Sequence, residues 1–303
     1  MGRGHAIGHH GELLQGTFQD RSGRSHRALV TMPLPGLVTT AEFRPLLDRA
    51  PDAPLVTVRP AWRRKAQAAA ELMLREHLPT ASGGELVLSG QAQPGLGLGS
   101  STSDVTATLR AVADCYGLRL STAEIAALAV RAEGASDSVM VEDRVVLFAH
   151  RSGRILEEFD SRLPGMLVVG CDTDPARGGV DTLAFRPPEH TPAEVASFRV
   201  LVGLLRHALA TRSVALLAQV AQASARINQR YLPTRGFATL CRTAREAGGL
   251  GVQVSHSGTV AGVIYDAGRP DAERQADRCV RLLRRRGFAD PQILTVTSAG
   301  ALV

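Results

Sequence analysis

The chain has 303 residues, of which 44% are apolar and 21% are charged, so it can bury a sizeable core and is long enough for about two domains. Its formal net charge of +6 rests on arginines scattered among acidic residues, without interleaved aromatic rings, so we do not expect nucleic acid as a partner. The four cysteines form no C-x-x-C pair, no run of 18 apolar residues occurs and the N-terminus lacks a signal peptide, so we expect a cytoplasmic protein without a disulfide framework or a membrane span.

Short extended segments punctuated by Pro and Gly are predicted in the first 60 residues, at 12–18, 27–32, 36–43 and 55–58. An amphipathic helix is predicted over 61–77 and a strand over 85–88. Three histidines, His5, His9 and His10, precede Glu12. Glycines surround them and no helical i, i+4 spacing joins them, so we favour substrate contact or surface exposure over a metal site.

A glycine-rich loop follows the strand and runs directly into a helix. It carries three glycines at alternate positions and then three small hydroxyl residues: Gly95, Gly97, Gly99, Ser100, Ser101 and Thr102. Glycines let the backbone turn tightly and present successive amide groups, and the helix start adds the positive end of its dipole. The loop therefore predicts a phosphate site, although simple N-capping of the helix by Ser100 or Ser101 is an alternative role for those two side chains.

Two well-known phosphate loops do not fit this stretch. A Walker A loop requires Lys after its last glycine, and the only lysine of the chain is Lys65. The dinucleotide-binding fingerprint requires G-x-G-x-x-G followed by a helix and then a strand, whereas the spacing here is G-x-G-x-G and a second helix follows.

That second helix begins with a capping box, Ser121-Thr122-Ala123-Glu124, and should run antiparallel to the loop helix because only a short turn joins the two. At about 1.5 Å of rise per residue, it returns most of the length of the loop helix. We therefore expect Glu133 and Asp137 to lie beside Ser100 and Ser101.

The second half of the chain mixes strands and helices in an irregular order. Strands are predicted at 143–149, 155–159, 166–171, 251–254, 260–265 and 292–297, and helices at 192–211, 213–229, 236–247 and 270–286. Regular alternation of strands with helices is absent, which favours the α+β class over a doubly wound sheet. Pro164-Gly165 suggests a boundary between a first domain, 1–163, and a second, 164–303.

Three motifs, taken in order, resemble the GHMP kinase superfamily. They are Gly11-Glu12-Leu13-Leu14-Gln15-Gly16, the loop 95–101 and the turn 255–262. Gly-Glu-Leu-Leu-Gln-Gly, Ser-Ser-Thr-Ser-Asp and Ser-His-Ser-Gly-Thr are together most similar to the L-threonine kinases of cobalamin synthesis, as are Gly178–Thr182 and Ile227–Gln229. The resemblance implies a two-domain GHMP kinase fold, with an N-terminal nucleotide-binding domain similar to ribosomal protein S5 and a C-terminal ferredoxin-like α/β sandwich.

The resemblance also implies ATP and Mg²⁺ as cofactors and a hydroxy amino acid as the small-molecule partner. The loop would hold the triphosphate, Ser101 and Glu133 would hold Mg²⁺, and Asp137 would act as the base or orient the attacking hydroxyl. Substrate contacts are expected from the first motif and from the last turn, at His10, Glu12, Ser257, Gly258 and Thr259. Asp172 and Asp174, on a loop after a strand, are candidates for binding a substrate ammonium group, with Arg177 for its carboxylate.

Three departures from the threonine kinases leave the acceptor open: Pro94 directly before the first glycine, Leu96 where those kinases often carry Lys, and a 133–137 segment one residue longer than usual. Homoserine or a modified hydroxy amino acid is the alternative acceptor. A non-catalytic nucleotide sensor or a nucleic-acid-binding protein is the alternative of another class. The sequence predicts no oligomeric state.

Overall fold

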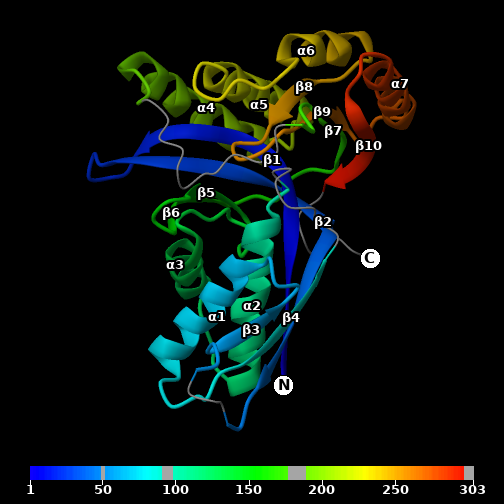
Figure 1. The fold of residues 1–303 in the computed structure, drawn as a ribbon. Coiled ribbons are helices and arrows are strands. Elements are labelled where there is room, and N and C mark those ends of the chain that lie inside the picture. The colour runs from blue at the N-terminus through cyan, green and yellow to red at the C-terminus, as the bar shows by residue number, and fades with distance from the viewer. Residues whose placement is uncertain (49–51, 91–97, 177–188, 297–303) are drawn as a thin grey trace.

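The computed structural model describes residues 1–48, 52–90, 98–176 and 189–296 (Figure 1). Its strands are β1 (Gly2–Gln19), β2 (Ser25–Pro45), β3 (Val56–Arg59), β4 (Gly84–Gly90), β5 (Val145–Ala149), β6 (Arg154–Phe159), β7 (Met166–Asp172), β8 (Gly251–Val254), β9 (Val260–Asp266) and β10 (Ala289–Val296). Its helices are α1 (Arg64–His77), α2 (Ser100–Tyr116), α3 (Thr122–Glu133), α4 (Pro192–Ala210), α5 (Val214–Asn228), α6 (Phe237–Glu246) and α7 (Ala272–Arg285). Most predicted elements are therefore present within a few residues of their expected bounds.

The first two strands are much longer than the sequence predicted. The segments expected at 12–18, 27–32 and 36–43 belong to β1 and β2, which pair antiparallel from Gly2↔Phe43 to Gln19↔Ser25. Glycines early in β1 weaken the strand pattern in the sequence, but they serve a packing need, because a Cβ on Gly4 would overlap the backbone of α2 at Ala107. Pro33 and Pro35 of β2 lie at or beside the register shift between Ile7↔Val38 and Gly8↔Leu34, where strands tolerate a missing N–H.

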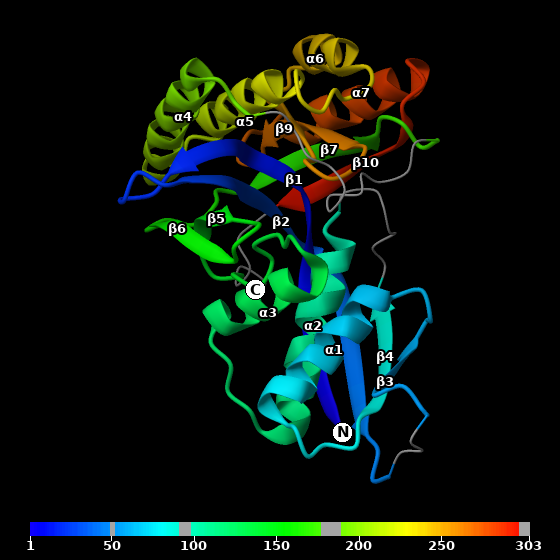
Figure 2. The same ribbon diagram turned by 60° about the vertical axis from the view of Figure 1, so that its left-hand side comes forward.

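The sheet is mixed but mostly antiparallel, which confirms the α+β class. Its strand order is β10-β7-β9-β8-β1-β2-β4-β3, with β5 joined to β2 and β6 joined to β5. Of these pairs, only β3–β4 is parallel. Figures 1 and 2 show α1 to α3 at one end of the molecule and α4 to α7 at the other, with β1 and β2 running between the two groups.

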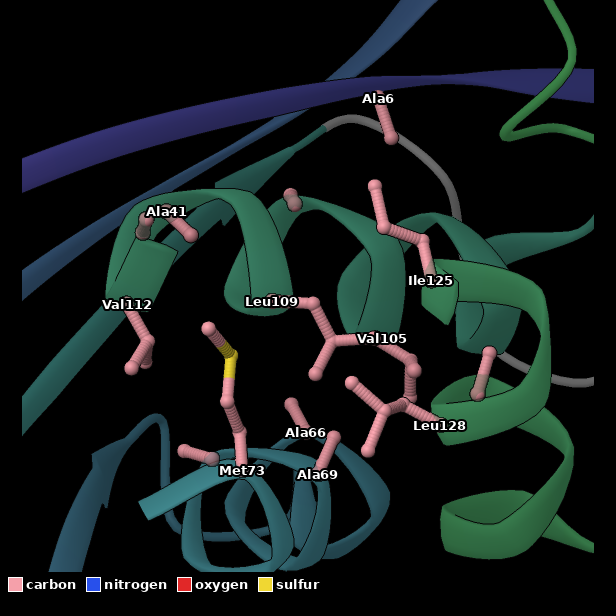
Figure 3. Packing of buried hydrophobic residues seen from close by; sticks show 14 of the residues in the cluster. Ala6, Ala41, Ala66, Ala69, Met73, Val105, Leu109, Val112, Ile125 and Leu128 are labelled. Atoms are coloured by element: carbon pink, nitrogen blue, oxygen red, sulfur yellow. The ribbon is translucent and has the colours of Figure 1, made fainter. Parts of the chain in front are cut away.

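Each end has its own apolar core. Figure 3 shows the first, in which residues of α1, α2 and α3 such as Met73, Leu109 and Leu128 interdigitate with Ala6 of β1. A second core joins the outer halves of β1 and β2 to β5, β7, α4 and α5, and it holds Leu13, Val30 and Phe198 in contact. This second core takes residues from both sides of position 163, and the domain division at 163/164 stays a prediction.

The four helices of the second half cover the sheet on one side. α4, which has 19 residues, begins with a capping box in which the Thr191 hydroxyl accepts from Glu194 N.

Within the described ranges, no helix has both the length and the apolar character needed to cross a bilayer.

Candidate active site

The start of α2 lies at the middle of the molecule and is not capped by a side chain of the described residues. Its N-cap is Gly99, which has a φ of +69°, a left-handed conformation that glycine adopts without strain. A Cβ on Gly99 would overlap the ring of His9, so both the turn and the close approach require glycine. The expected N-capping by Ser100 or Ser101 is therefore wrong, and the first amide groups of α2 face outward with the positive end of the helix dipole. Gly95 and Gly97 lie outside the described residues.

Glu133, at the last turn of α3, reaches back to the start of α2. The Ser101 hydroxyl donates to Glu133 Oε2 at 2.7 Å, and the Thr102 hydroxyl donates to Oε1 at 2.8 Å. The predicted antiparallel return of α3 is confirmed by these contacts. It is supported at the far end by the predicted capping box, in which Ser121 Oγ accepts from Glu124 N and the Glu124 carboxylate accepts from Ser121 N.

The Glu133 carboxyl group is buried without a cationic side chain in hydrogen-bonding contact among the described residues. Burial raises its pKa to about 7, and the two hydroxyl donors offset this rise only in part. A buried carboxylate whose anionic form is disfavoured is stabilised by a bound cation, and a small hard ion such as Mg²⁺ prefers oxygen ligands of this kind. The chemistry of Ser101 and Glu133 therefore fits Mg²⁺.

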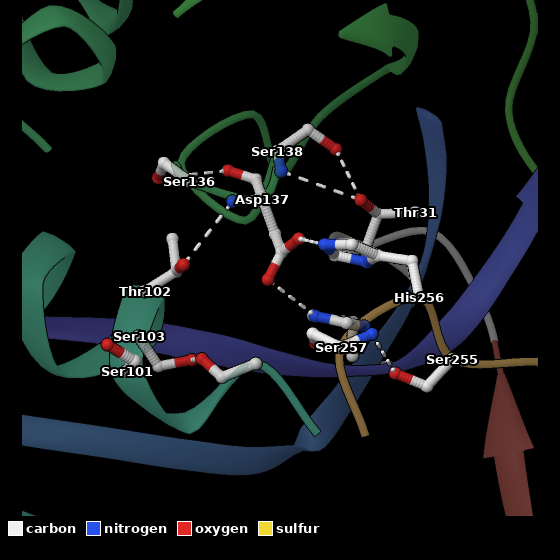
Figure 4. A network of polar contacts seen from close by, with 12 residues as sticks. Thr31, Ser101, Thr102, Ser103, Ser136, Asp137, Ser138, Ser255, His256 and Ser257 are labelled. Atoms are coloured by element: carbon white, nitrogen blue, oxygen red, sulfur yellow. Dashed lines mark hydrogen bonds and ion pairs between the residues drawn. The ribbon is translucent and has the colours of Figure 1, made fainter. Parts of the chain in front are cut away.

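Asp137, four residues beyond Glu133, has different surroundings. Its Oδ2 lies 2.9 Å from His9 Nε2, its Oδ1 lies 3.7 Å from His256 Nε2, and its backbone N–H donates to the Thr102 hydroxyl at 3.3 Å. Figure 4 shows the carboxylate between the start of α2 and the turn that carries His256. Thr102 thus connects the two acidic residues, since it donates to Glu133 and accepts from Asp137.

Glu12 completes this group of charges from the middle of β1. Its two carboxylate oxygens contact the His256 backbone N–H and Nδ1, each at 2.8 Å, so the carboxylate fixes both the turn and the ring. β1 has register shifts between His9 and Glu12, and this bulge separates the two side chains around the site. Glu12 is buried, and it positions His256 within the protein.

The side chains of His9, Asp137 and His256 shift one another's pKa. Burial alone would raise the pKa of Asp137, but the charges of His9 and His256 hold it well below its usual range. Burial would lower the pKa of His256, but Glu12 and Asp137 raise it to about 9. The pKa of His9 is also raised, because Asp137 more than offsets its burial. Asp137 is therefore anionic at neutral pH and is already compensated by protein cations.

The ligand atoms of His9, Glu12 and Asp137 also lie within 4.8 Å of one another. His9 and Glu12 are fully buried, so the expected surface exposure of His9 is wrong. His9 contacts Asp137, and both Glu12 and Asp137 contact His256, so each carboxylate of the group has an imidazole partner. Glu133, rather than this group, has the unmet need for a cation.

His10 does not join the site. Its ring packs between Gly170 of β7 and Gly262 of β9, and Gln253 Nε2 lies 2.5 Å from His10 Nδ1. Burial lowers its pKa to about 4, so the ring is neutral. The substrate contact expected of His10 therefore has no support in the geometry, because the strand directs His9 and His10 to different neighbours.

The turn 255–259 contributes mainly through His256. Within it, Ser257 N donates to Ser255 Oγ at 3.2 Å, and the Thr259 carbonyl accepts from Thr173 N and Oγ1. Gly258 lies between them in the same turn. The structure places Ser257, Gly258 and Thr259 beside the site as structural members of this turn.

Asp172 and Asp174 bind within their own loop and its surroundings. Asp172 Oδ1 accepts from Asp174 N at 3.0 Å, and Asp174 forms an ion pair with Arg235 at 3.1 Å. Neither carboxylate contacts Asp137 or the start of α2 among the described interactions, and Arg177 lies outside the described residues. The expected ammonium site at Asp172 therefore has no support in the geometry.

A pocket adjoins this site at His256. It has about 720 Å³ of non-atom space, including its open mouth. Its lining residues come from β1, β2, the turn after β5, the end of α5 and the turn 254–256, and include Gln15, Arg27, His150, Arg151, Asn228 and His256. The rings of His150 and His256 lie 5.4 Å apart, so the pocket begins one ring away from Asp137.

Sequence reasoning did not single out Arg27 or Arg151, and for His9 it favoured substrate contact or surface exposure over its observed contact with Asp137. Single arginines carry no local motif, and only the pairing of β2 with β5 brings these two to one cavity. The signal for His9 was its place two residues before Gly11, next to the Gly-Glu motif.

The comparisons with known proteins agree with this geometry. Residues 64–141, which include α1, α2 and α3, match the family described as GHMP kinases N terminal domain. The chain is 24% identical over 310 aligned positions to the L-threonine kinase of Salmonella typhimurium, covering 96% of this chain and 91% of that protein. It is 27% identical to the L-threonine kinase of Citrobacter freundii over 58% of this chain and 60% of that one.

The fold likeness extends over the whole chain. The crystal structure of homoserine kinase from Cytophaga hutchinsonii superposes with a TM-score of 0.66 at 14% identity, covering 99% of this chain and 96% of that one. At this identity the likeness concerns the fold, and it supports the two-domain GHMP architecture that the motifs implied. Over residues 64–141 the chain is similar to the GHMP kinases, over nearly its whole length it shares their fold, and it is an ATP-dependent small-molecule kinase.

Proposed function

We propose that this kinase transfers the γ-phosphoryl group of ATP to the side-chain hydroxyl of L-threonine and releases O-phospho-L-threonine and ADP. The similarity to two L-threonine kinases supports the acceptor. The observation that carries the chemistry is the arrangement of two carboxyl groups, Glu133 and Asp137, around the uncapped start of α2.

The donor would bind at the start of α2. The first amide groups of the helix and the Ser100 hydroxyl would receive phosphate oxygens, because a helix N-terminus offers free N–H donors and a positive dipole end. Ser101 and Glu133 would hold Mg²⁺, which supplies charge neutralisation for the phosphate oxygens when bound. Thr102 holds the unliganded Glu133 carboxylate in place.

Asp137 would orient the acceptor. As an anionic carboxylate beside the phosphate site, it can accept a hydrogen bond from the threonine hydroxyl and aim the oxygen at the γ-phosphorus. The oxygen–phosphorus bond forms as the bond from the γ-phosphorus to the bridging oxygen of ADP breaks, and the hydroxyl proton passes late to Asp137 and then to solvent. A carboxylate with a low pKa suits this role, since phosphoryl transfer depends more on position and charge than on a strong base.

His9 and His256 would act as positioning residues. They hold the two oxygens of Asp137 from different sides, and Glu12 holds His256 in turn. Their positive charge keeps Asp137 ionised in a buried site that already contains Glu133.

The experiment that tests this function is an acceptor panel. Purified protein is incubated with Mg-ATP and, separately, L-threonine, L-homoserine and L-serine, and ADP release is followed together with the phosphoamino acid by mass spectrometry. We expect the highest kcat/KM for L-threonine, with ADP and phosphothreonine in equal amounts. A higher kcat/KM for L-homoserine would identify L-homoserine, and not L-threonine, as the acceptor. ADP release no faster than in the control without acceptor would contradict the proposal.

A further inference from the structure

The pocket beside His256 is lined by an unusual pair of cations. Arg27 from β2 and Arg151 from the turn after β5 both face it, and His256, whose imidazole is charged, forms part of the same wall. Burial lowers the pKa of Arg27, and the like charge of Arg151 lowers it further, while Tyr231 and Glu189 act in the opposite sense. The two guanidinium groups line one cavity, and a guanidinium group can bind a carboxylate through two parallel hydrogen bonds.

Neutral polar groups complete the lining. Asn228 also lines the pocket, and its amide nitrogen donates to the carbonyls of Gln15 and Ser224, which fix its orientation. His190 is buried, its Nδ1 contacts the Thr17 hydroxyl at 2.8 Å, and its Nε2 has no hydrogen-bond partner among the described residues. A buried nitrogen without a partner costs free energy unless a ligand or water satisfies it.

Glu189 acts on Arg27, and three other acidic side chains near the pocket have partners of their own. Glu12 and Asp137 contact His256 and His9, and Glu194 accepts from the hydroxyl of Tyr231 and pairs with Arg230. The ring of His150 adds no charge, because burial, together with the charge of His256, lowers its pKa to about 3. Arg27, Arg151 and His256 are therefore the cationic groups that line the pocket among the described residues.

We infer that this pocket binds the carboxylate of the acceptor and that Arg27 and Arg151 are the residues that recognise it. The inference rests on the proposed function, because it takes the acceptor hydroxyl to lie at Asp137. In an amino acid the carboxylate is only a few bonds from the side-chain hydroxyl, and the pocket begins beside His256, which itself contacts Asp137. The enzyme then selects hydroxy acids over neutral hydroxyl compounds of the same shape.

The first test compares L-threonine with L-threoninamide in the wild-type enzyme, since the amide has nearly the same shape and lacks the negative charge. We expect kcat/KM to be about 10²-fold lower for the amide, the loss typical of two charge-assisted hydrogen bonds. Equal kcat/KM values for the two compounds would overturn the inference while leaving the kinase function intact.

The second test uses the variants Arg27→Gln and Arg151→Gln, with Arg154→Gln as the matched control. Arg154 lies three residues beyond Arg151, and its side chain is 57% exposed. We expect each pocket variant to lower kcat/KM for L-threonine about 10-fold or more, with less than a threefold change for L-threoninamide and in the KM for ATP. Equal losses for both acceptors would overturn the assignment. Arg27→Lys, which keeps the charge, should recover part of the loss, and circular dichroism checks the fold.

Direct binding separates this inference from the proposed reaction. Calorimetric titration of L-threonine and L-threoninamide, with a non-hydrolysable ATP analogue present, needs no turnover. Tighter binding of L-threonine that is lost in both pocket variants would support the carboxylate site even if no phosphothreonine were formed. Equal binding of both compounds would contradict it.

Discussion

Glu133 and Asp137 lie four residues apart, and both are buried, but their neighbours drive the two carboxyl groups in opposite directions. Glu133 receives only neutral hydroxyl donors, and its pKa rises to about 7. Asp137 lies between two imidazoles, and its pKa falls below the usual range. Burial disfavours the charged form at both positions, so the difference comes from the partners.

This difference suits the two groups to the separate tasks that we propose for them. A carboxyl group without a protein cation is suited to receive one from outside, and a carboxylate with two protein cations is suited to remain charged while a substrate binds. One short segment that begins with the last residue of α3 therefore provides both groups, and the contrast depends on residues that are remote in the sequence, His9 and His256. The following changes test it, from the largest expected effect to the smallest.

Asp137→Asn removes the charge that the two histidines stabilise. We expect kcat with L-threonine to fall about 10³-fold, within the range for loss of a group that orients a proton in the transition state, with little change in the KM for ATP. Steady-state kinetics with varied ATP and varied acceptor measure both values. Asp143→Asn, at an exposed residue paired with Arg144, is the control and should retain full activity. Full activity in Asp137→Asn would remove Asp137 from the mechanism.

Glu133→Gln should reduce kcat/KM for Mg-ATP about 10²-fold and stabilise the protein without ligand. The folded pKa of about 7 exceeds the ordinary value of 4.5, so the folded state binds the extra proton, and the wild type loses stability as pH rises from about 4.5 to about 7. A glutamine side chain does not titrate, so the Glu133→Gln variant does not lose stability in this way as pH rises. Urea unfolding at pH 4.5 and pH 8 without Mg²⁺ should show the stability of the variant relative to the wild type increasing with pH. If the difference in unfolding free energy between variant and wild type were the same at both pH values, burial would not raise the pKa of Glu133 in the folded protein.

His256→Gln tests the other half of the comparison. The pKa of His256 is raised from 6.5 to about 9, so its contribution to stability is full below pH 6.5 and is lost as pH rises through 9. We expect the stability advantage of the wild type over the variant to shrink across this window, and kcat to be about 10-fold lower in the variant near pH 7. The wild-type activity should also fall above pH 9, and the variant should lack that step. A pH profile of kcat for both proteins measures this step, and the same fall above pH 9 in the variant would show that His256 does not cause it.

Gly99→Ala should have the smallest effect on catalysis and a measurable effect on stability. The substitution forces a left-handed φ on alanine and places a methyl group against the His9 ring. Gly23→Ala is a matched control, because Gly23 also has a positive φ, of +82°, but no atom lies near its absent Cβ. We expect both to lose about 1 kcal/mol from backbone strain and Gly99→Ala to lose more. Equal losses would show that the His9 ring can move aside.

The local part of the site could be predicted from the sequence. The loop helix, the capping box at Ser121 and the short turn between α2 and α3 are properties of neighbouring residues, and together they bring Glu133 to Ser101. The α+β class followed in the same way from the irregular order of strands and helices.

The long-range part could not be predicted in the same way. Arg27 and Arg151 meet only because β2 pairs with β5, and the pocket they line has no sequence motif. The placement of His9 and Glu12 around the site depends on a bulge in β1, and the extent of β1 was hidden by glycines that allow close packing on α2. The N-cap at Gly99 was missed because the hydroxyl residues after it are equally good caps in isolation.

The contact between Glu12 and His256 spans 244 positions of the chain. During synthesis β1 leaves the ribosome first, and its partner β8 and the turn after it leave among the last elements. The start of α2 and Glu133 can come together early, because their contacts are local, but Asp137 gains its second imidazole only when nearly all of the chain is available. The half of the proposed site around Glu133 therefore needs only residues up to 133, whereas the half around Asp137 needs the chain as far as His256.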